Sequence, residues 1–387
     1  MGAARSSDQF TMLLPHRLLP LSLVLFSLSA CDGGAPPASS TASNEQANAV
    51  EPTSAKAQSF AYVSNQDAGV SIIDIKTMTA VGTIDPGAEG PRGIGISEDG
   101  KLLVTANRGG GNLSVIDRES GKLLRQIEIG QNPEFVRVRG NQAFVTFEPA
   151  AVGGPPPKPG SPEALALEKQ REDEDTEPAQ IAVVDLLEGV VTRRIVGGME
   201  TEGIEFSADG EKILVTNEAD DTISVHDIAT GSEIKSIDIK PYGVRPRGIK
   251  IGPDGQKYFA TLEHANKVLV LDAEFEPVTT FDTGNVPYGI SFDAKGEKLF
   301  VALAHGKALE VFDAKTYESI KRIPTGDRCW HFSFTPDNAQ IMVACGRSHE
   351  LVVIDTQSLE VVKRLGDKHL PWGIVTWPHA QGSLDTP

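Results

Sequence analysis

Cationic side chains are scarce in this sequence. Lys and Arg number 36 against 53 Asp and Glu, which gives a net charge of −17 over 387 residues. Proteins that hold DNA or RNA do so largely by neutralising phosphates with Lys and Arg, so this balance argues against a nucleic-acid partner. The sequence also lacks a Gly-x-Ser-x-Gly motif, a Walker loop, a dinucleotide fingerprint and a Cys-x-x-Cys-His haem motif. No catalytic residue can therefore be assigned from a motif.

Long apolar runs are also missing, apart from a short one near the N-terminus. The run Leu18–Leu28 follows a short basic stretch and is too short to span a bilayer, which is typical of a secretory signal. It leads into the letters LSAC, which end at Cys31 and resemble the bacterial lipobox, whose Cys is lipidated after cleavage. We therefore expect a lipoprotein signal peptide over 1–30 and a flexible tether over 31–58. An ordinary signal with a chance Cys is the alternative.

Lipid on Cys31 predicts a location in the periplasm, with the protein anchored to a bacterial membrane and the bilayer as a partner. Asp32 follows the lipid-bearing Cys, which resembles the signal for inner-membrane retention in enteric bacteria. The inner membrane is therefore favoured over the outer one.

Short apolar runs that end in Asp recur through the rest of the chain. They close at seven positions: Asp74, Asp117, Asp185, Asp227, Asp272, Asp313 and Asp355. The intervals between these positions are 43, 68, 42, 45, 41 and 42 residues. A period of about 40–50 residues with four strand-like runs per unit is typical of a propeller blade. We predict an all-β fold, a seven-bladed β-propeller over residues 59–378, in which each Asp bonds nearby backbone and starts a turn.

The two ends of the repeat predict how the ring closes. The first run, 60–65, matches the second strand of the unit, and the last run, 371–377, matches the first strand. One blade therefore takes its innermost strand from the C-terminus and its other three from the N-terminus, which removes an open sheet edge. The acidic, Pro-rich insertion 149–178 falls in a loop between second and third strands. It is either a solvated loop or a lid or docking arm for a basic partner. Residues 379–387 are left as a tail.

The recurring motifs Pro-x-Gly-Ile, Asp-Gly, Tyr/Phe-Val-Thr and Val-x-Asp resemble those of the YVTN-repeat β-propellers of bacterial secreted proteins and lipoproteins. The resemblance covers about residues 60–378 and specifies architecture rather than activity. Some such propellers are similar to proteins found beside PQQ-dependent oxidation systems, which implies a role beside a periplasmic redox system. Similarity to the haem-binding cytochrome d1 propeller, or to seven-bladed lactonases that use Glu, His and Arg around the channel, implies two alternatives.

A ring of dissimilar residues follows from superposing the starts of the seven innermost strands. The loops between second and third strands, and those between fourth and next first strands, lie at one end of a propeller, here called the top end. The middle position of each start gives this ring: Arg92, Glu134, Glu202, Arg247, Tyr288, Trp330 and Trp372. Arg suits capture of a carboxylate or phosphate, and the adjacent aromatics suit an apolar or ring-shaped ligand. The alternative is an Arg–Glu network that lines the channel, with aromatics plugging its mouth.

Histidines form a second asymmetry at the top end. Five of the eight are predicted to lie on one sector: His264, His305, His331, His349 and His369. Neutral imidazoles so placed are candidate ligands of Cu, Zn or a haem iron, although scattered surface histidines are the commoner case. His226 replaces an apolar residue in a third strand and is interpreted as structural.

Two of the three cysteines fall in one predicted hairpin. Cys329 and Cys345 stand nearly opposite each other, so outside the cytoplasm a disulfide is the simplest prediction, and copper binding by reduced thiols is the alternative. Taken together, these features favour a membrane-tethered propeller that binds a small ligand or a periplasmic protein on its top face without catalysing a reaction.

Overall fold

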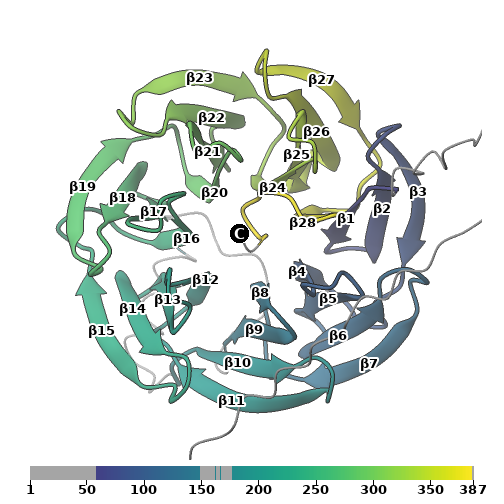
Figure 1. Ribbon diagram of the computed structural model, residues 1–387, viewed down its shortest axis with the longest axis horizontal. Helices are drawn as coiled ribbons and strands as arrows, with labels where there is room; N and C mark the ends of the chain where they lie inside the picture. Colours follow the sequence, from purple (N-terminus) through teal and green to yellow (C-terminus); the bar gives the residue numbers. More distant parts are fainter. Residues whose placement is uncertain (1–57, 149–161, 163–165, 167–176, 386–387) are drawn as a thin grey trace, which may run out of the picture. The chain divides into compact units, whose positions relative to one another are not determined.

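The computed structural model describes residues 58–148 and 177–385, together with residues 162 and 166. Twenty-eight strands form seven four-stranded antiparallel sheets, which are arranged as blades around a central channel (Figure 1). The predicted seven-bladed, all-β architecture is therefore confirmed. The signal peptide, most of the tether and most of the insertion lie outside the described residues. Within those residues, no helix is long and apolar enough to cross a membrane.

We number the blades from the N-terminus and give the strands of each from the channel outward. Blades 1 to 3 are β28 (Pro371–Trp377), β1 (Phe60–Asn65), β2 (Val70–Asp74), β3 (Thr79–Ile84); β4 (Pro91–Ile96), β5 (Leu102–Asn107), β6 (Asn112–Asp117), β7 (Leu123–Glu128); and β8 (Val136–Arg139), β9 (Gln142–Phe147), β10 (Gln180–Asp185), β11 (Val190–Val196). Blades 4 and 5 are β12 (Thr201–Phe206), β13 (Lys212–Asn217), β14 (Thr222–Asp227), β15 (Glu233–Asp238); and β16 (Pro246–Ile251), β17 (Tyr258–Leu262), β18 (Lys267–Leu271), β19 (Pro277–Asp282). Blades 6 and 7 are β20 (Pro287–Phe292), β21 (Lys298–Leu303), β22 (Ala308–Asp313), β23 (Ser319–Pro324); and β24 (Cys329–Phe334), β25 (Gln340–Cys345), β26 (Glu350–Asp355), β27 (Glu360–Leu365), with a short 3₁₀ helix η1 (Gly346–Ser348) after β25.

The ring closes through blade 1, as predicted. Strand β1 pairs antiparallel with β28, and Phe60 lies opposite Trp377 in their register. The first and last strands of the propeller therefore share one sheet.

The seven aspartates at the ends of the third strands start turns, as predicted. Asp117, for example, accepts hydrogen bonds at Oδ1 from both the backbone N–H and the hydroxyl of Ser120. In the other six blades the same carboxylate accepts backbone N–H groups two to four residues further on. The turn needs an acceptor there, which explains why the residue recurs.

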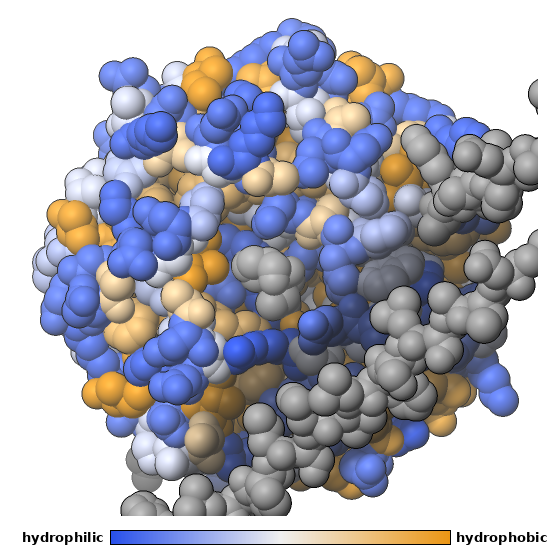
Figure 2. All heavy atoms as spheres, in the orientation of Figure 1, coloured by the Kyte–Doolittle hydropathy of each residue, from blue (hydrophilic) through white to orange (hydrophobic). Residues whose placement is uncertain are grey.

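Apolar side chains of the middle strands pack between neighbouring blades, while the outer strands stay partly exposed. Val115 of blade 2 and Val145 of blade 3, for instance, belong to one buried cluster. The exposed large apolar residues lie mainly on or beside the outermost strands, such as Val81, Leu124 and Val278. On the face seen in Figure 2, apolar residues are scattered around the rim rather than gathered in one patch. Single exposed apolar residues of this kind are ordinary for a protein surface.

The innermost strands approach one another so closely that their third position is usually glycine. A Cβ on Gly93 would lie 2.6 Å from the backbone nitrogen of Val136 in the next blade. The N–H of Gly93 donates to the carbonyl of Glu134 in that strand. Two blades depart from the pattern, because Phe135 and His331 occupy the third position. Their rings meet in the channel with centroids 6.2 Å apart.

The predicted tail folds back into the channel rather than leaving the propeller. The N–H of Ser383 donates to the carbonyl of Phe332, and Phe334 donates its N–H to Gln381. Leu384 is 2% exposed and belongs to the central apolar cluster. Figure 1 accordingly shows the yellow segment that follows β28 inside the ring. Residues up to Asp385 are therefore part of the folded domain.

Candidate functional site

The ring of residues predicted at the top end does line the channel, and most of it is buried. Six of its seven members are at most 9% exposed, and Trp330 alone is more open. Arg92 forms an ion pair with Glu134 and donates from Nε to the side-chain oxygen of Gln66 at 2.8 Å. Burial lowers the pKa of Arg92 to about 10, so it stays charged at neutral pH. Its guanidinium is already engaged on two sides.

Arg247 is engaged more fully still. It pairs with three carboxylates, those of Glu202, Glu218 at 2.6 Å and Glu263 at 2.7 Å. Its Nη1 also donates to the hydroxyl of Tyr288 at 3.3 Å, and its guanidinium lies 4.9 Å from the centre of that ring. Although burial opposes ionisation of Glu263, Arg247 holds the pKa of that carboxyl below its ordinary value.

A second arginine joins the same carboxylates. Arg245 pairs with Glu218, with Glu200 at 3.7 Å and with Glu263 at 3.8 Å. We call Arg245, Arg247 and their four glutamates the acidic network. Two cations facing four carboxylates leave this side of the mouth negative, so Arg247 is held by the protein itself rather than presented to an anion.

The adjoining part of the mouth, at blades 6 and 7, is basic. His305, Arg328 and Arg347 come from the loops of blades 6 and 7, and we call these three residues the basic sector. Burial and the charge of Arg347 lower the pKa of Arg328, and burial and Arg328 lower that of His305, so the three groups lie within each other's field. The Nε atom of Arg328 is buried and has no hydrogen-bond partner among the described residues.

The backbone explains why Arg328 stands at the mouth. The residue before six of the seven innermost strands has a positive φ, and at Arg328 this angle is 53°. The carbonyl of Arg328 accepts the N–H of Gly346 across the loop. A β-carbon on Gly346 would run into the ring of Trp330, so that ring covers the start of η1. Trp330 also packs against a small apolar cluster formed by Val286, Tyr288 and Ala304. The basic sector therefore borders an apolar floor.

The middle of the channel is closed by rings packed edge-to-face and at tilted angles. His331 is 2% exposed and lies 4.4 Å from Trp372 and 5.5 Å from Tyr288 between ring centroids. Its Nδ1 is 3.0 Å from the hydroxyl of Ser383 in the tail, and its Nε2 has no partner among the described residues. Burial lowers the pKa of His331 to about 3, so the imidazole is neutral at physiological pH.

At the other end of the channel, here called the bottom end, four buried charged groups hold the tail. The backbone carbonyl of Asp385 accepts from Nη1 of Arg137 at 2.6 Å and from Lys250. Glu205 lies 3.6 Å from Arg137 and 3.8 Å from Lys250, and Ser333 donates to the Asp385 carboxyl at 2.8 Å. Burial raises the pKa of Asp385 to about 7 and lowers that of Lys250 to about 8.

The five candidate histidines do not share one place. His331 lies inside the channel, whereas His264, His305, His349 and His369 are exposed at the top end. His349 accepts the N–H of Leu370 at Nδ1, 3.2 Å away. Among the described residues no three or more His, Cys, Asp or Glu side chains are grouped to hold a metal ion. His226, interpreted as structural, is buried with Nε2 2.8 Å from the hydroxyl of Ser224.

The predicted disulfide between Cys329 and Cys345 is present and joins β24 to β25. It fixes the base of the loop that carries Arg347, directly beside Arg328. Sequence reasoning singled out Trp330 and His305 but missed Arg328 and Arg347. The available signal was three basic residues in adjoining loops beside an aromatic strand start.

The comparisons with known proteins agree with this architecture. Residues 33–141 match a family model described as YNCE-like beta-propeller, and with the seven-bladed fold this match confirms the predicted resemblance to YVTN-type propellers. No curated protein matches the chain.

Solved propellers resemble the chain in fold at low identity. A functionally unknown protein from Desulfotomaculum acetoxidans is 17% identical with a TM-score of 0.67, covering 82% of this chain and 98% of that one. The Pseudomonas aeruginosa periplasmic gluconolactonase PpgL is 16% identical with a TM-score of 0.64, covering 83% and 99%. Dihydro-heme d1 dehydrogenase NirN is 18% identical with a TM-score of 0.55, covering 81% and 65%. At these identities the likeness concerns the fold alone.

Proposed function

We propose that this protein is a binding propeller that captures an anionic ligand with an apolar, planar body at the basic sector. The single observation that carries the proposal is the buried Nε of Arg328, which no described residue satisfies. A buried guanidinium nitrogen without a partner costs free energy, and a carboxylate can accept from Nε and a terminal nitrogen of the same fork. Arg347 and His305 add positive potential beside it.

The apolar floor supports a planar ligand in particular. Trp330 is partly exposed and offers a ring face beside the basic sector, with the buried side chains of Tyr288 and Val286 packed behind it, and planar ligands stack well on such a face. The acidic network in the adjoining blades 4 and 5 repels a second anion and so fixes the orientation of a bound carboxylate. The resemblance to propellers beside quinoprotein oxidation makes aromatic carboxylates and haem propionates of periplasmic redox chemistry the first ligands to test.

We expect Arg328→Ala to weaken binding of such a ligand by about 10- to 100-fold, on the order of 1–3 kcal/mol, because it removes the bidentate donor. Calorimetry and quenching of Trp330 fluorescence, with PQQ and protoporphyrin IX as probes, would measure this change. Arg125→Ala is the matched control, since Arg125 lies on an outer strand and donates only to a backbone carbonyl. Equal affinities in the parent and Arg328→Ala would reject the site. Turnover of gluconolactone would indicate a lactonase instead.

The proposed location in the periplasm rests on the lipobox-like end of the signal. We expect labelled fatty acid to enter the parent protein in a bacterial host and to be absent from Cys31→Ser, because the thiol at that position carries the lipid. Gel autoradiography with fractionation of membranes would read both forms. Label that persists in Cys31→Ser, or that never enters the parent, would contradict the lipid anchor while leaving the basic sector untouched.

A further inference from the structure

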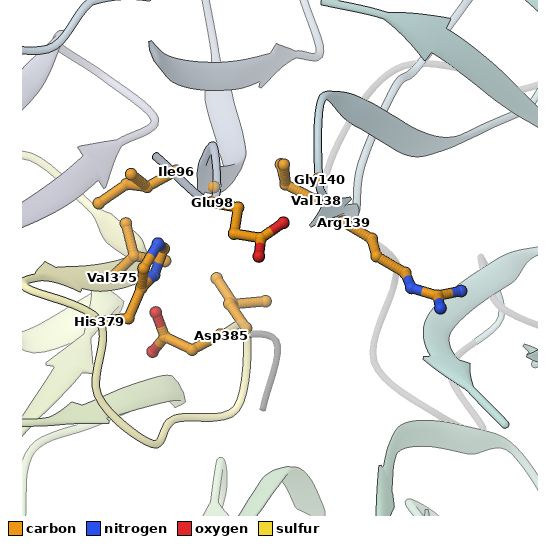
Figure 3. Close-up of a pocket in the computed structure, with 10 residues that line it drawn as sticks. Ile96, Glu98, Val138, Arg139, Gly140, Val375, His379 and Asp385 are labelled. Carbon is orange, nitrogen blue, oxygen red and sulfur yellow. The ribbon is translucent and has the colours of Figure 1, made fainter. Parts of the chain in front are cut away.

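A pocket opens at the bottom end of the channel. The packed rings of His331, Trp372 and Tyr288 separate it from the basic sector at the top end. The pocket has a volume of about 310 Å³ and lies between the ends of β4 and β8, the end of β28 and the tail (Figure 3). Its lining residues are Gly95, Ile96, Glu98, Val138, Arg139, Gly140, Val375, His379, Leu384 and Asp385. This volume is at the small end of the range of about 300–1,000 Å³ that is usual for ligand pockets.

The pocket exists because one blade lacks a side chain that the others have. The fifth position of the innermost strand carries Arg137, Glu205, Lys250, Ser291, Ser333 and Val375 in six blades, and Gly95 in blade 2. A Cβ on Gly95 would lie 2.6 Å from Cγ2 of Val138, so any larger residue would intrude on the pocket wall. The opening is therefore a local departure from the repeat.

Glu98 is a second departure at the same place. The equivalent turn position carries Ala208, Pro253, Ala294 and Pro336 in blades 4 to 7, so the turn does not require a carboxylate. The carboxylate of Glu98 points into the pocket in Figure 3 and makes no hydrogen bond or ion pair with a described side chain. A free carboxylate at the mouth of a partly apolar pocket is a site for a cationic group.

Among the described residues, no cationic side chain competes for that carboxylate. The guanidinium of Arg139 points away from the pocket in Figure 3, because it donates to the carbonyl of Gly210 and stacks 5.3 Å from the centre of the Phe206 ring. The Nε2 atom of His379 lies 3.1 Å from the carbonyl oxygen of Ser97. Because a carbonyl can only accept, this nitrogen carries the proton. The Nδ1 of a neutral His379 is then an acceptor.

The remaining walls are partly apolar, and Asp385 also lines them. Ile96, Val138, Val375 and Leu384 surround the space, and the last two come from β28 and the tail. From this combination we infer that the pocket binds a small primary amine, with its ammonium group on Glu98 and a short alkyl chain against the four aliphatic side chains. The net charge of −17 draws small cations toward the protein and favours the same class of ligand. This site is independent of the proposed anion site at the top end.

The test uses n-hexylamine as the probe and the purified full chain in calorimetry. We expect binding of n-hexylamine, no binding of hexanoate, and a weaker interaction for n-propylamine because its chain covers less of the walls. Glu98→Ala should reduce the affinity for n-hexylamine by at least about 10-fold, the usual scale of a lost charge-assisted hydrogen bond.

The control variants keep the outcome clear. Glu98→Ala should fold normally, since Ala208 and Ala294 occupy the same turn position in other blades; thermal unfolding would verify this. Glu119→Ala removes an exposed carboxylate from another turn of blade 2 and should leave n-hexylamine binding unchanged. The inference is overturned if the parent does not bind n-hexylamine at about 10 mM, or if Glu98→Ala binds it as well as the parent does.

Discussion

Glu205→Gln should lower the free energy of unfolding by about 3–5 kcal/mol, the usual cost of breaking a buried ion pair from one side. Glu205 is 1% exposed and lies between Arg137 and Lys250. Together with the carboxyl of Asp385 in the tail, these residues form a buried group of two cations and two acids. Glutamine keeps the shape and the hydrogen-bond acceptor but removes one charge. The remaining positive charge would then be buried without a counter-ion, in surroundings where water cannot solvate it.

Urea unfolding followed by circular dichroism would measure this change. Glu211→Gln is the matched control, because Glu211 is an exposed residue six positions further on in the same hairpin and should change stability by no more than about 0.5 kcal/mol. If Glu205→Gln matched the control, the buried charges at the bottom end would not stabilise the fold as a set.

Loss of the disulfide should have the second-largest effect. The bridge closes a loop with a sequence separation of 16, so the double variant Cys329→Ala/Cys345→Ala should lose roughly 3 kcal/mol in the chain-entropy account. Both cysteines are fully buried, which adds a packing loss. Because the bridge also fixes the loop that carries Arg347, the same variant should bind a basic-sector ligand more weakly.

Reduction provides an internal comparison for this prediction. A reductant should lower the melting temperature of the parent toward that of the double variant and leave the double variant itself unchanged. Two thiols that react with a thiol reagent in the native, unreduced protein would contradict the bridge as a stabilising element.

Local pattern was sufficient to predict the blades. Strand, turn and register signals lie within about forty residues of one another, and they place Asp117 and its equivalents, the closing strand β28 and the Cys329–Cys345 pair correctly. The turn aspartates repeat because each blade faces the same local requirement. In blades 2 to 7 the pairing of strands can therefore be predicted from a single repeat.

The contents of the channel could not be predicted in the same way. Its lining residues come from seven distant segments that meet only after the ring closes. The local repeat pattern therefore could not predict that Arg247 pairs with three glutamates. The tail carried no strand pattern, yet its last described residue, Asp385, is 5% exposed among Arg137, Lys250 and Ser333. The two non-glycine third positions, Phe135 and His331, were visible in the sequence as exceptions, but their meeting across the channel depends on ring geometry.

Closure through blade 1 also determines when the domain can become complete during synthesis. Phe60 pairs with Trp377, so the first sheet lacks its innermost strand until β28 has been made. The tail residues that enter the channel are made later still, because they run to Asp385. A ribosome that has released only the first six repeats holds an open row of sheets with a free edge at each end, which is prone to pairing with other chains. The ring can therefore close only after β28 has left the ribosome, and a chain that stops before Asp385 lacks the carbonyl that accepts from Arg137 and Lys250.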